Sequence, residues 1–217
     1  PLMKAIVRQL GRPIAAPSAN RFGRISPTSA SAVEKELSGL IPMIIDGGAC
    51  REGLESTIIR PEISADAGKK GVLIHVLRAG PVTKEMLQRF GKVVRAKKNR
   101  SEDAPEAPGQ LASHYAPVTP LRLLAKPSDF KPEPNKKYGL LSYCGSDKAG
   151  FIGLHDWSVV EELSPGNGKL AEAAVRFFYV LRLLDDSGVD EIIVVSVGEA
   201  KSEEQIRSAM ALGADRG

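Results

Sequence analysis

The segment from Pro13 to Ser31, PIAAPSANRFGRISPTSAS, gathers hydroxyl and amide side chains around one turn. A short apolar run precedes Ser18 and Asn20, and Ser26 comes directly before an expected helix. The unpaired N–H groups and partial positive charge at a helix N-terminus favour phosphate or carboxylate. Ser, Asn and Gly are also the residues that ordinary turns select. The segment alone therefore leaves two interpretations open: a strand–turn–helix connection, or a polar cradle for an anionic or zwitterionic ligand.

Two later segments place hydroxyl and guanidinium groups at the ends of expected strands. In GLESTIIR, Ser56 and Thr57 lead into one strand, and in HVLRAG, Arg78 ends the next strand before a glycine. Hydroxyls at the start of a strand can face a pocket, although Thr also simply favours strands. An arginine in such a place suits bidentate contact with phosphate or carboxylate, and an ordinary surface arginine is the other interpretation.

A charged, Pro-rich stretch follows, RAKKNRSEDAPEAPGQ at 95–110, with almost nothing to bury, and we interpret it as a linker. It runs into LASHYAP, which suddenly carries Leu111, His114 and Tyr115 between prolines. Aromatic and imidazole groups on a restrained loop suit stacking or hydrogen bonding to a bound ligand. A hydrophobic anchor that docks the linker on a domain is the alternative interpretation.

No familiar catalytic motif is present in the sequence. It contains no Walker-type phosphate loop, no zinc-ligand spacing and no nucleophile elbow, so no catalytic residue is identified and no metal site is predicted. Cys50 and Cys144 fit neither a disulfide framework nor a metal cluster and are interpreted as plain thiols. With no membrane-length apolar run and no signal segment, this composition favours the cytoplasm.

The 217 residues leave room for one large domain or two small ones, and 42% hydrophobic with 26% charged residues is ordinary for a globular protein. The net charge of +4 permits a polyanionic partner such as RNA or a nucleotide without requiring one. Apolar periodicity predicts alternating helices and strands on both sides of the linker. We expect helices at 2–10, 27–40, 83–91, 169–188 and 203–212; Ser26 is the expected N-cap of the second, with Pro27 as its first residue, and Gly188 ends the fourth. An apolar run lies at 13–16. We expect strands at 41–48, 55–61, 71–80, 121–124, 138–143 and 191–197.

Four segments in this order, APSANRFGRISPT, GLESTII, LRAG and APGQLASHYAPVTPL, resemble the threonylcarbamoyl-AMP synthase family of the YrdC/YwlC type, in its long two-domain form. The resemblance spans essentially the whole chain, and its Ser-Ala-Asn and His-Tyr-Ala-Pro motifs are specific in combination. It implies an α/β fold in three parts. These are the C-terminal part of a YrdC-like twisted α/β catalytic domain (1–94), a Pro-rich linker with the HYAP motif (95–118), and a small Rossmann-like three-layer α/β domain (119–217).

The family resemblance also implies a reaction. Members condense L-threonine, bicarbonate and ATP into threonylcarbamoyl-AMP and pyrophosphate, usually with Mg²⁺, which is a nucleotidyltransferase activity. The product feeds the tRNA-modification machinery that makes threonylcarbamoyladenosine. Such chemistry depends on positioning and charge neutralisation more than on a nucleophilic side chain.

Carried over by motif, the resemblance implies an ATP site and a threonine site on this chain. The expected ATP contacts are Ser18, Ser26, Arg78 and Tyr115; the expected threonine contacts are the backbone of Ala16 and the hydroxyl of Ser56; the expected supporting residues are Asn20, Thr57 and His114.

One departure from the family pattern concerns the start of the chain. The family's N-terminal half carries a Thr/Tyr-Gly segment, a Lys/Arg-rich region and an Arg that contacts threonine, all of which should precede Pro1. The stretch from Leu2 to Gly11 reads as a helix already under way. We therefore expect a partial form whose chemistry is crippled.

Two alternative functions accompany the synthase interpretation. One is an RNA-binding or translation-related YrdC-like module without catalysis, which the basic charge would suit. The other, a carbamoyl-transfer relative from hydrogenase maturation, is disfavoured by the HYAP linker and the second domain.

Overall fold

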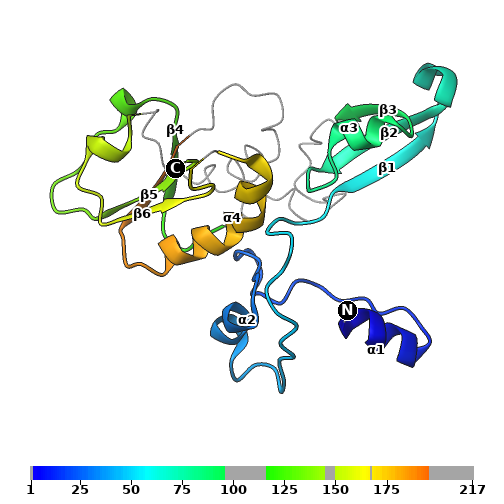
Figure 1. The fold of residues 1–217 in the computed structure, drawn as a ribbon, viewed down its shortest axis with the longest axis horizontal. Coiled ribbons are helices and arrows are strands. Elements are labelled where there is room, and N and C mark those ends of the chain that lie inside the picture. The colour runs from blue at the N-terminus through cyan, green and yellow to red at the C-terminus, as the bar shows by residue number, and fades with distance from the viewer. Residues whose placement is uncertain (1, 96–115, 145–149, 167, 196–217) are drawn as a thin grey trace.

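The structure is a computed structural model that describes residues 2–95, 116–144, 150–166 and 168–195 of the chain. Two β-sheets lie apart from each other, and one long helix runs along the larger sheet (Figure 1). The chain is therefore a mixed α/β protein, as the sequence predicts.

The smaller sheet consists of β1 (Ile58–Ile63), β2 (Val72–Arg78) and β3 (Lys92–Arg95), in that order. β1 and β2 are antiparallel, whereas β2 and β3 are parallel. A short 3₁₀ segment, η1 (Ala65–Lys70), joins β1 to β2, and helix α3 (Lys84–Gln88) lies between β2 and β3. The predicted strand at 71–80 and the short helix at 83–91 are confirmed with tighter bounds. The strand predicted at 55–61 is confirmed but shifted to 58–63, and β3 is an additional strand.

The larger sheet contains β4 (Leu121–Leu124), β5 (Tyr138–Ser142), β6 (Val159–Glu162) and β7 (Glu191–Val195), in the order β4-β7-β5-β6. All neighbouring strands are parallel. The central strands β5 and β7 are buried along their whole length, as near-continuous apolar strands covered on both faces should be. Three of these strands and the long helix α4 (Leu170–Asp185) confirm the prediction, and β6 is additional.

The two faces of the larger sheet carry separate hydrophobic clusters. On one face, Phe177, Leu181 and Leu184 of α4 pack against Leu141 and Ile192 of the sheet. This packing follows the helical spacing that the sequence shows. On the other face, the short 3₁₀ segments η2 (Pro127–Asp129) and η3 (Ile152–Leu154) are flanked by Phe130 and Phe151, which pack on Tyr138, Leu140 and Ile193.

Helix α1 (Leu2–Leu10) forms where it is expected, and Gly11 ends it with a φ of 68°. In the described part of the chain α1 buries none of its residues. It lies away from both sheets (Figure 1). Its apolar face therefore adds nothing to the two clusters of the larger sheet.

The predicted helix at 27–40 is wrong at its start. Helix α2 spans Ala30–Leu37, and its N-cap is Ser29, whose hydroxyl accepts from the N–H of Ala32 at 3.3 Å. Ser26 is not the cap because its hydroxyl donates to Glu55 instead. The hydrogen bond to Glu55, a residue distant in the sequence, thus replaces the capping bond that the local sequence favours.

The predicted strand at 41–48 is also wrong, and the apolar run at 13–16 forms no strand either. Both segments are irregular, and Met43 and Ile45 are exposed. A strand needs a neighbour to pair with, and none of the described strands pairs with either segment. The chain turns instead at Gly48, and Cys50 returns to donate its N–H to the carbonyl of Thr28 at 2.8 Å. The expected linker core at 96–110 and the last helix at 203–212 lie outside the described residues.

Replacing Leu184 by Ala tests whether α4 carries the core. Leu184 is 0% exposed within the cluster, whereas its neighbour Leu183 is 38% exposed. We expect Leu184→Ala to lower the free energy of unfolding by about 2–5 kcal/mol through lost burial and a residual cavity. Leu183→Ala is the matched control and should change it by less than about 0.5 kcal/mol. Urea unfolding followed by circular dichroism measures both; equal losses would contradict this assignment of the core.

Candidate functional site

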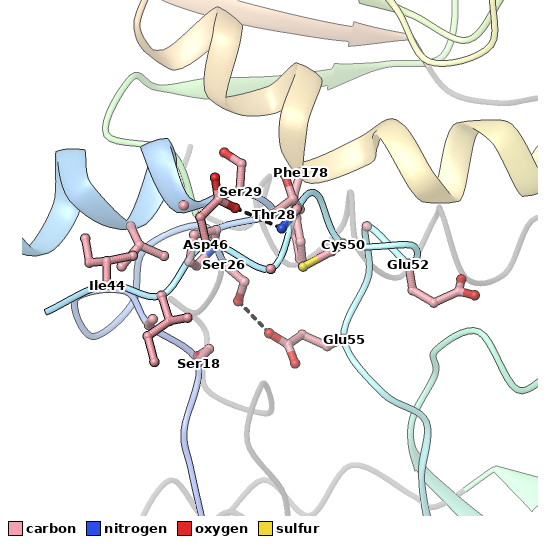
Figure 2. Close-up of a pocket in the computed structure, with 18 of the residues that line it drawn as sticks. Ser18, Ser26, Thr28, Ser29, Ile44, Asp46, Cys50, Glu52, Glu55 and Phe178 are labelled. Atoms are coloured by element: carbon pink, nitrogen blue, oxygen red, sulfur yellow. Dashed lines mark hydrogen bonds between the residues drawn. The ribbon is translucent and has the colours of Figure 1, made fainter. Parts of the chain in front are cut away.

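A cavity of about 320 Å³ lies where the start of α2, the loop at 44–55 and helix α4 meet (Figure 2). Its polar lining combines hydroxyls with carboxylates. The hydroxyls are Ser18, Ser26, Thr28 and Ser29, and the carboxylates are Asp46, Glu52 and Glu55. No Lys, Arg or His is among the lining residues that the structure describes. The cavity therefore favours a ligand that offers hydrogen-bond donors or positive charge on this side.

Glu55 is the centre of the hydrogen bonding around this cavity. The hydroxyl of Ser26 donates to Oε1 of Glu55 at 2.5 Å (Figure 2), and Oε2 of Glu55 lies 3.7 Å from Nη2 of Arg78. The side chains are sheltered, at 24% exposed for Glu55 and 11% for Arg78. Shielding from water strengthens both contacts relative to a surface pair.

Arg78 also holds the loop that carries Glu55. Its Nε donates to the carbonyl of Ser56 at 2.9 Å, and its Nη2 donates to the hydroxyl of Ser56 at 3.0 Å. Three predicted site residues, Ser26, Ser56 and Arg78, are therefore brought together, and Glu55 links them. The guanidinium fork that suits a bidentate ligand is directed at this loop in the described structure.

Gly80 explains why the strand end can come so close to this loop. A Cβ at this position would lie 2.4 Å from the carbonyl oxygen of Glu55 and 2.4 Å from the amide nitrogen of Thr57. Only a residue without a side chain fits against that backbone. The glycine of LRAG thus sets the approach of β2 to the GLEST loop.

Thr57 and Asn20 act on the backbone in this structure. The hydroxyl of Thr57 donates to the carbonyl of Val82 at 2.9 Å and accepts from its N–H at 3.0 Å. The amide of Asn20 donates to the carbonyls of Arg21 and Arg24 and so closes the turn between the SAN and SPT triplets. Both residues shape the loops that carry the site.

The remaining predicted residues are placed unevenly. Ser18 is exposed and lines the cavity, whereas Ala16 is exposed and is not part of the lining. His114 and Tyr115 lie outside the described residues. The next residue, Ala116, is 2% exposed, and its N–H donates to the carbonyl of Gly23 at 3.0 Å. The chain that leaves the HYAP motif is thus fixed to the turn between Asn20 and Ser26.

Sequence reasoning missed Glu55 and Phe178. Glu55 directly precedes Ser56 and Thr57 in the GLEST motif, so its charge beside two hydroxyl residues could have marked it as a candidate site residue. Phe178 of α4 reaches the cavity from a distant part of the chain. Its place in an apolar helical stripe predicts only core packing, and no local pattern could have assigned it to the cavity.

A resident metal site is not supported by the donor set. Within the described ranges, no group of three or more His, Cys, Asp and Glu side chains could hold a metal ion.

None of the helices among the described residues is long and apolar enough to cross a membrane.

The fold and the site define a mixed α/β protein whose ligand cavity is built from loop hydroxyls and carboxylates beside a sheet arginine. The family model described as "Threonylcarbamoyl-AMP synthase, C-terminal domain" matches residues 82–211, and the model described as "Telomere recombination" matches residues 1–80. Because the first of these covers more than half of the chain, the chain belongs to the threonylcarbamoyl-AMP synthase family. The resemblance found in the sequence is confirmed.

Several relatives carry the same name, "Threonylcarbamoyl-AMP synthase". The Bacillus subtilis protein is 34% identical over 206 residues, covering 90% of this chain and 55% of the relative. The Schizosaccharomyces pombe protein is 31% identical over 224 residues, covering 92% and 51%. The Pyrococcus abyssi protein is 34% identical over 191 residues, covering 87% and 54%. The chain thus spans about half the length of these relatives.

Solved structures agree with this assignment. The crystal structure of P. abyssi Sua5 complexed with L-threonine matches with a TM-score of 0.71 at 29% identity, covering 96% of this chain and 60% of that chain. A P. abyssi Sua5 variant in which a His-Tyr pair is replaced by alanines matches equally well, with 59% of that chain covered.

Gly80→Ala tests the close approach of β2 to the GLEST loop. The added methyl group must displace backbone at Glu55 and Thr57, so we expect a loss of about 1–3 kcal/mol in the free energy of unfolding. Gly47→Ala is the control, because nothing lies within 4 Å of a Cβ there. Chemical unfolding compares the two variants, and an unperturbed Gly80→Ala protein would show that the loop is held elsewhere.

Proposed function

We propose that this chain takes part in L-threonylcarbamoyladenylate synthesis, making threonylcarbamoyl-AMP from L-threonine, bicarbonate and ATP. The observation that carries the proposal is the network Ser26–Glu55–Arg78–Ser56, which joins residues of three separate motifs. Ser26 and Glu55 line the cavity, and Arg78 and Ser56 are linked to it through Glu55. The shared name of the relatives and the likeness to a threonine-bound Sua5 structure support it.

The proposed ligand contacts follow the family motifs. Ser18, Ser26, Arg78 and Tyr115 bind ATP, and the backbone of Ala16 and the hydroxyl of Ser56 bind L-threonine. Asn20, Thr57 and His114 support these contacts. The cavity position of Ser18 and Ser26, and the direct hydrogen bond between Arg78 and Ser56, support adjacent nucleotide and amino-acid sites.

Charge complementarity supports a zwitterionic amino acid as one ligand. The ammonium group of threonine suits a lining that includes Asp46, Glu52 and Glu55, and its hydroxyl suits the neighbouring serines. The triphosphate brings negative charge to the same region, so ATP enters with Mg²⁺ on its phosphates. In this proposal Mg²⁺ is part of the nucleotide substrate.

The proposed reaction needs little covalent help from the protein. The amine of threonine attacks the carbon of bicarbonate, a C–O bond breaks and water leaves, which gives threonine carbamate. A carbamate oxygen then attacks the α-phosphorus of ATP, from which pyrophosphate leaves. This is a nucleotidyl transfer to a carbamate. The side chains orient the reactants and neutralise developing charge, which is how such transfers are accelerated. The product passes to the tRNA-modification machinery.

The proposed domain division is 1–94, 95–118 and 119–217. The three-stranded sheet, at 58–95, and the four-stranded sheet, at 121–195, fall on either side of the proposed linker, which supports this division. The all-parallel order of the larger sheet, with α4 on one face, supports a Rossmann-like three-layer domain there. Neither the relatives' names nor the site gives a reason to prefer the RNA-binding alternative.

Replacing Arg78 by Gln tests the proposed function. Loss of the guanidinium removes the contacts to Ser56 and Glu55 and any contact to phosphate, so we expect ATP binding to weaken at least about 10-fold. Arg89→Gln is the control, because the guanidinium of Arg89 lies over the ring of Phe90 just after α3, whereas that of Arg78 contacts Ser56 and Glu55. Calorimetric titration of the chain with MgATP and with L-threonine measures both effects.

Pyrophosphate release is the second measurement. The chain is assayed alone and fused to the part of the B. subtilis relative that it does not cover. We expect release from the fusion only when threonine, bicarbonate and ATP are all present. A fusion that releases no pyrophosphate, together with a chain that binds neither ligand, would contradict the proposed function.

A further inference from the structure

Helix α4, which packs on the larger sheet, contacts residues next to both partners of the Ser26–Glu55 hydrogen bond. On the Ser26 side, Nη2 of Arg182 donates to the carbonyl of Ile25, the residue directly before Ser26. On the Glu55 side, Gly53 and Leu54 pack against the helix. The two residues of this bond, 29 positions apart in the sequence, are therefore each held within two positions of a contact with α4.

The Arg182 contact is sheltered and has two acceptors. Besides the carbonyl of Ile25, Nη2 of Arg182 lies 3.1 Å from Oε1 of Glu36 on α2, and these two side chains are only 14% and 13% exposed. Ile25 itself is 2% exposed and belongs to the same hydrophobic cluster as α4. The guanidinium thus ties α4 to the backbone at Ile25 and to α2 at once.

Gly53 lets the GLEST loop approach the backbone of α4 closely. A Cβ at Gly53 would lie 1.9 Å from the carbonyl oxygen of Val175, so the loop and the helix backbone touch without an intervening side chain. Leu54 is partly buried against the α4 cluster, and Phe178 of α4 lines the cavity itself. The position of the GLEST loop is therefore set by the surface of α4.

The end of α4 also holds the chain after the linker. The carboxylate of Asp185 accepts the N–H of Val118 at 3.1 Å and the N–H of Thr119 at 2.8 Å. Asp186, the next residue, pairs with Lys35 of α2 at 2.7 Å on an exposed surface. The last turn of α4 and its C-cap thus hold three segments together: the residue before Ser26, helix α2 and the chain at Val118 and Thr119.

We propose that α4, which packs on the larger sheet, sets the positions of the Ser26 segment and the GLEST loop. Arg182 is the positioning residue for Ser26 and, through Ser26, for Glu55 and Arg78. The consequence for substrate binding rests on the function proposed above; the mechanical part does not. A guanidinium suits this task because Nη2 alone carries two N–H donors, which serve the carbonyl of Ile25 and the carboxylate of Glu36 together. It is also more weakly hydrated than a lysine ammonium, so sheltering it costs less.

The experiment compares two arginines of the same helix. Arg182→Gln removes the contacts to Ile25 and Glu36, whereas among the described residues Arg176→Gln removes a bond to the carbonyl of Glu162 within the larger sheet. Hydrogen exchange followed by mass spectrometry reads peptides covering 24–29 and 52–56, with the core strand 138–142 as reference. We expect at least about 10-fold faster exchange in both site peptides of Arg182→Gln and unchanged exchange in β5.

Ligand binding separates positioning from mere stability. In calorimetric titrations of the folded variants, Arg182→Gln should weaken L-threonine and MgATP binding about 10-fold. Arg182→Lys should restore part of it, and Arg176→Gln should bind like the parent chain. Equal exchange in the two Gln variants would overturn the proposal, as would faster exchange with unchanged affinity in Arg182→Gln. A parent chain that binds neither ligand contradicts the proposed function, and the exchange data then decide the mechanical proposal alone.

Discussion

The carboxylate of Glu55 is the group on which the rest of the site depends. It accepts a hydrogen bond from Ser26 with one oxygen and faces the guanidinium of Arg78 with the other. A sheltered carboxylate without such partners would be costly to keep ionised, and a sheltered arginine would face the same cost. The pairing therefore fixes the two loops relative to each other, since removing either charged group would cost the other one of its sheltered partners.

This constraint explains an otherwise local difference between the predicted and the observed helix. Ser26 followed by Pro27 has the form of a helix start, yet the helix begins at Ala30 with Ser29 as its cap. Residues 26–29 stay outside the helix because the Ser26 hydroxyl and the Ile25 carbonyl are each engaged by partners from distant segments. Propensity gives way where tertiary contacts supply stronger bonds.

Much of the rest was predictable for physical reasons. The apolar runs at β2, β5 and β7 and the helical stripe of α4 carry their own periodicity, so their types follow from the sequence. The segment at 41–48 has an equally apolar run and is not a strand, because pairing partners are a property of the fold and not of the run. The site divides in the same way. Ser26, Ser56 and Arg78 could be proposed from motifs, whereas the roles of Phe178 and Arg182 depend on where α4 docks.

The docking of α4 against these loops makes the larger sheet part of the structure that supports the site. Loops that carry hydroxyls, carboxylates and one arginine have little apolar surface of their own, so a rigid element must supply their geometry. Helix α4 is such an element, since its opposite face is buried in the cluster on β5 and β7. The closest contact uses Gly53, where any larger residue would push the GLEST loop away from the helix. The positions of the two proposed ligand sites are thus set less by the motifs than by the surface against which the motifs rest.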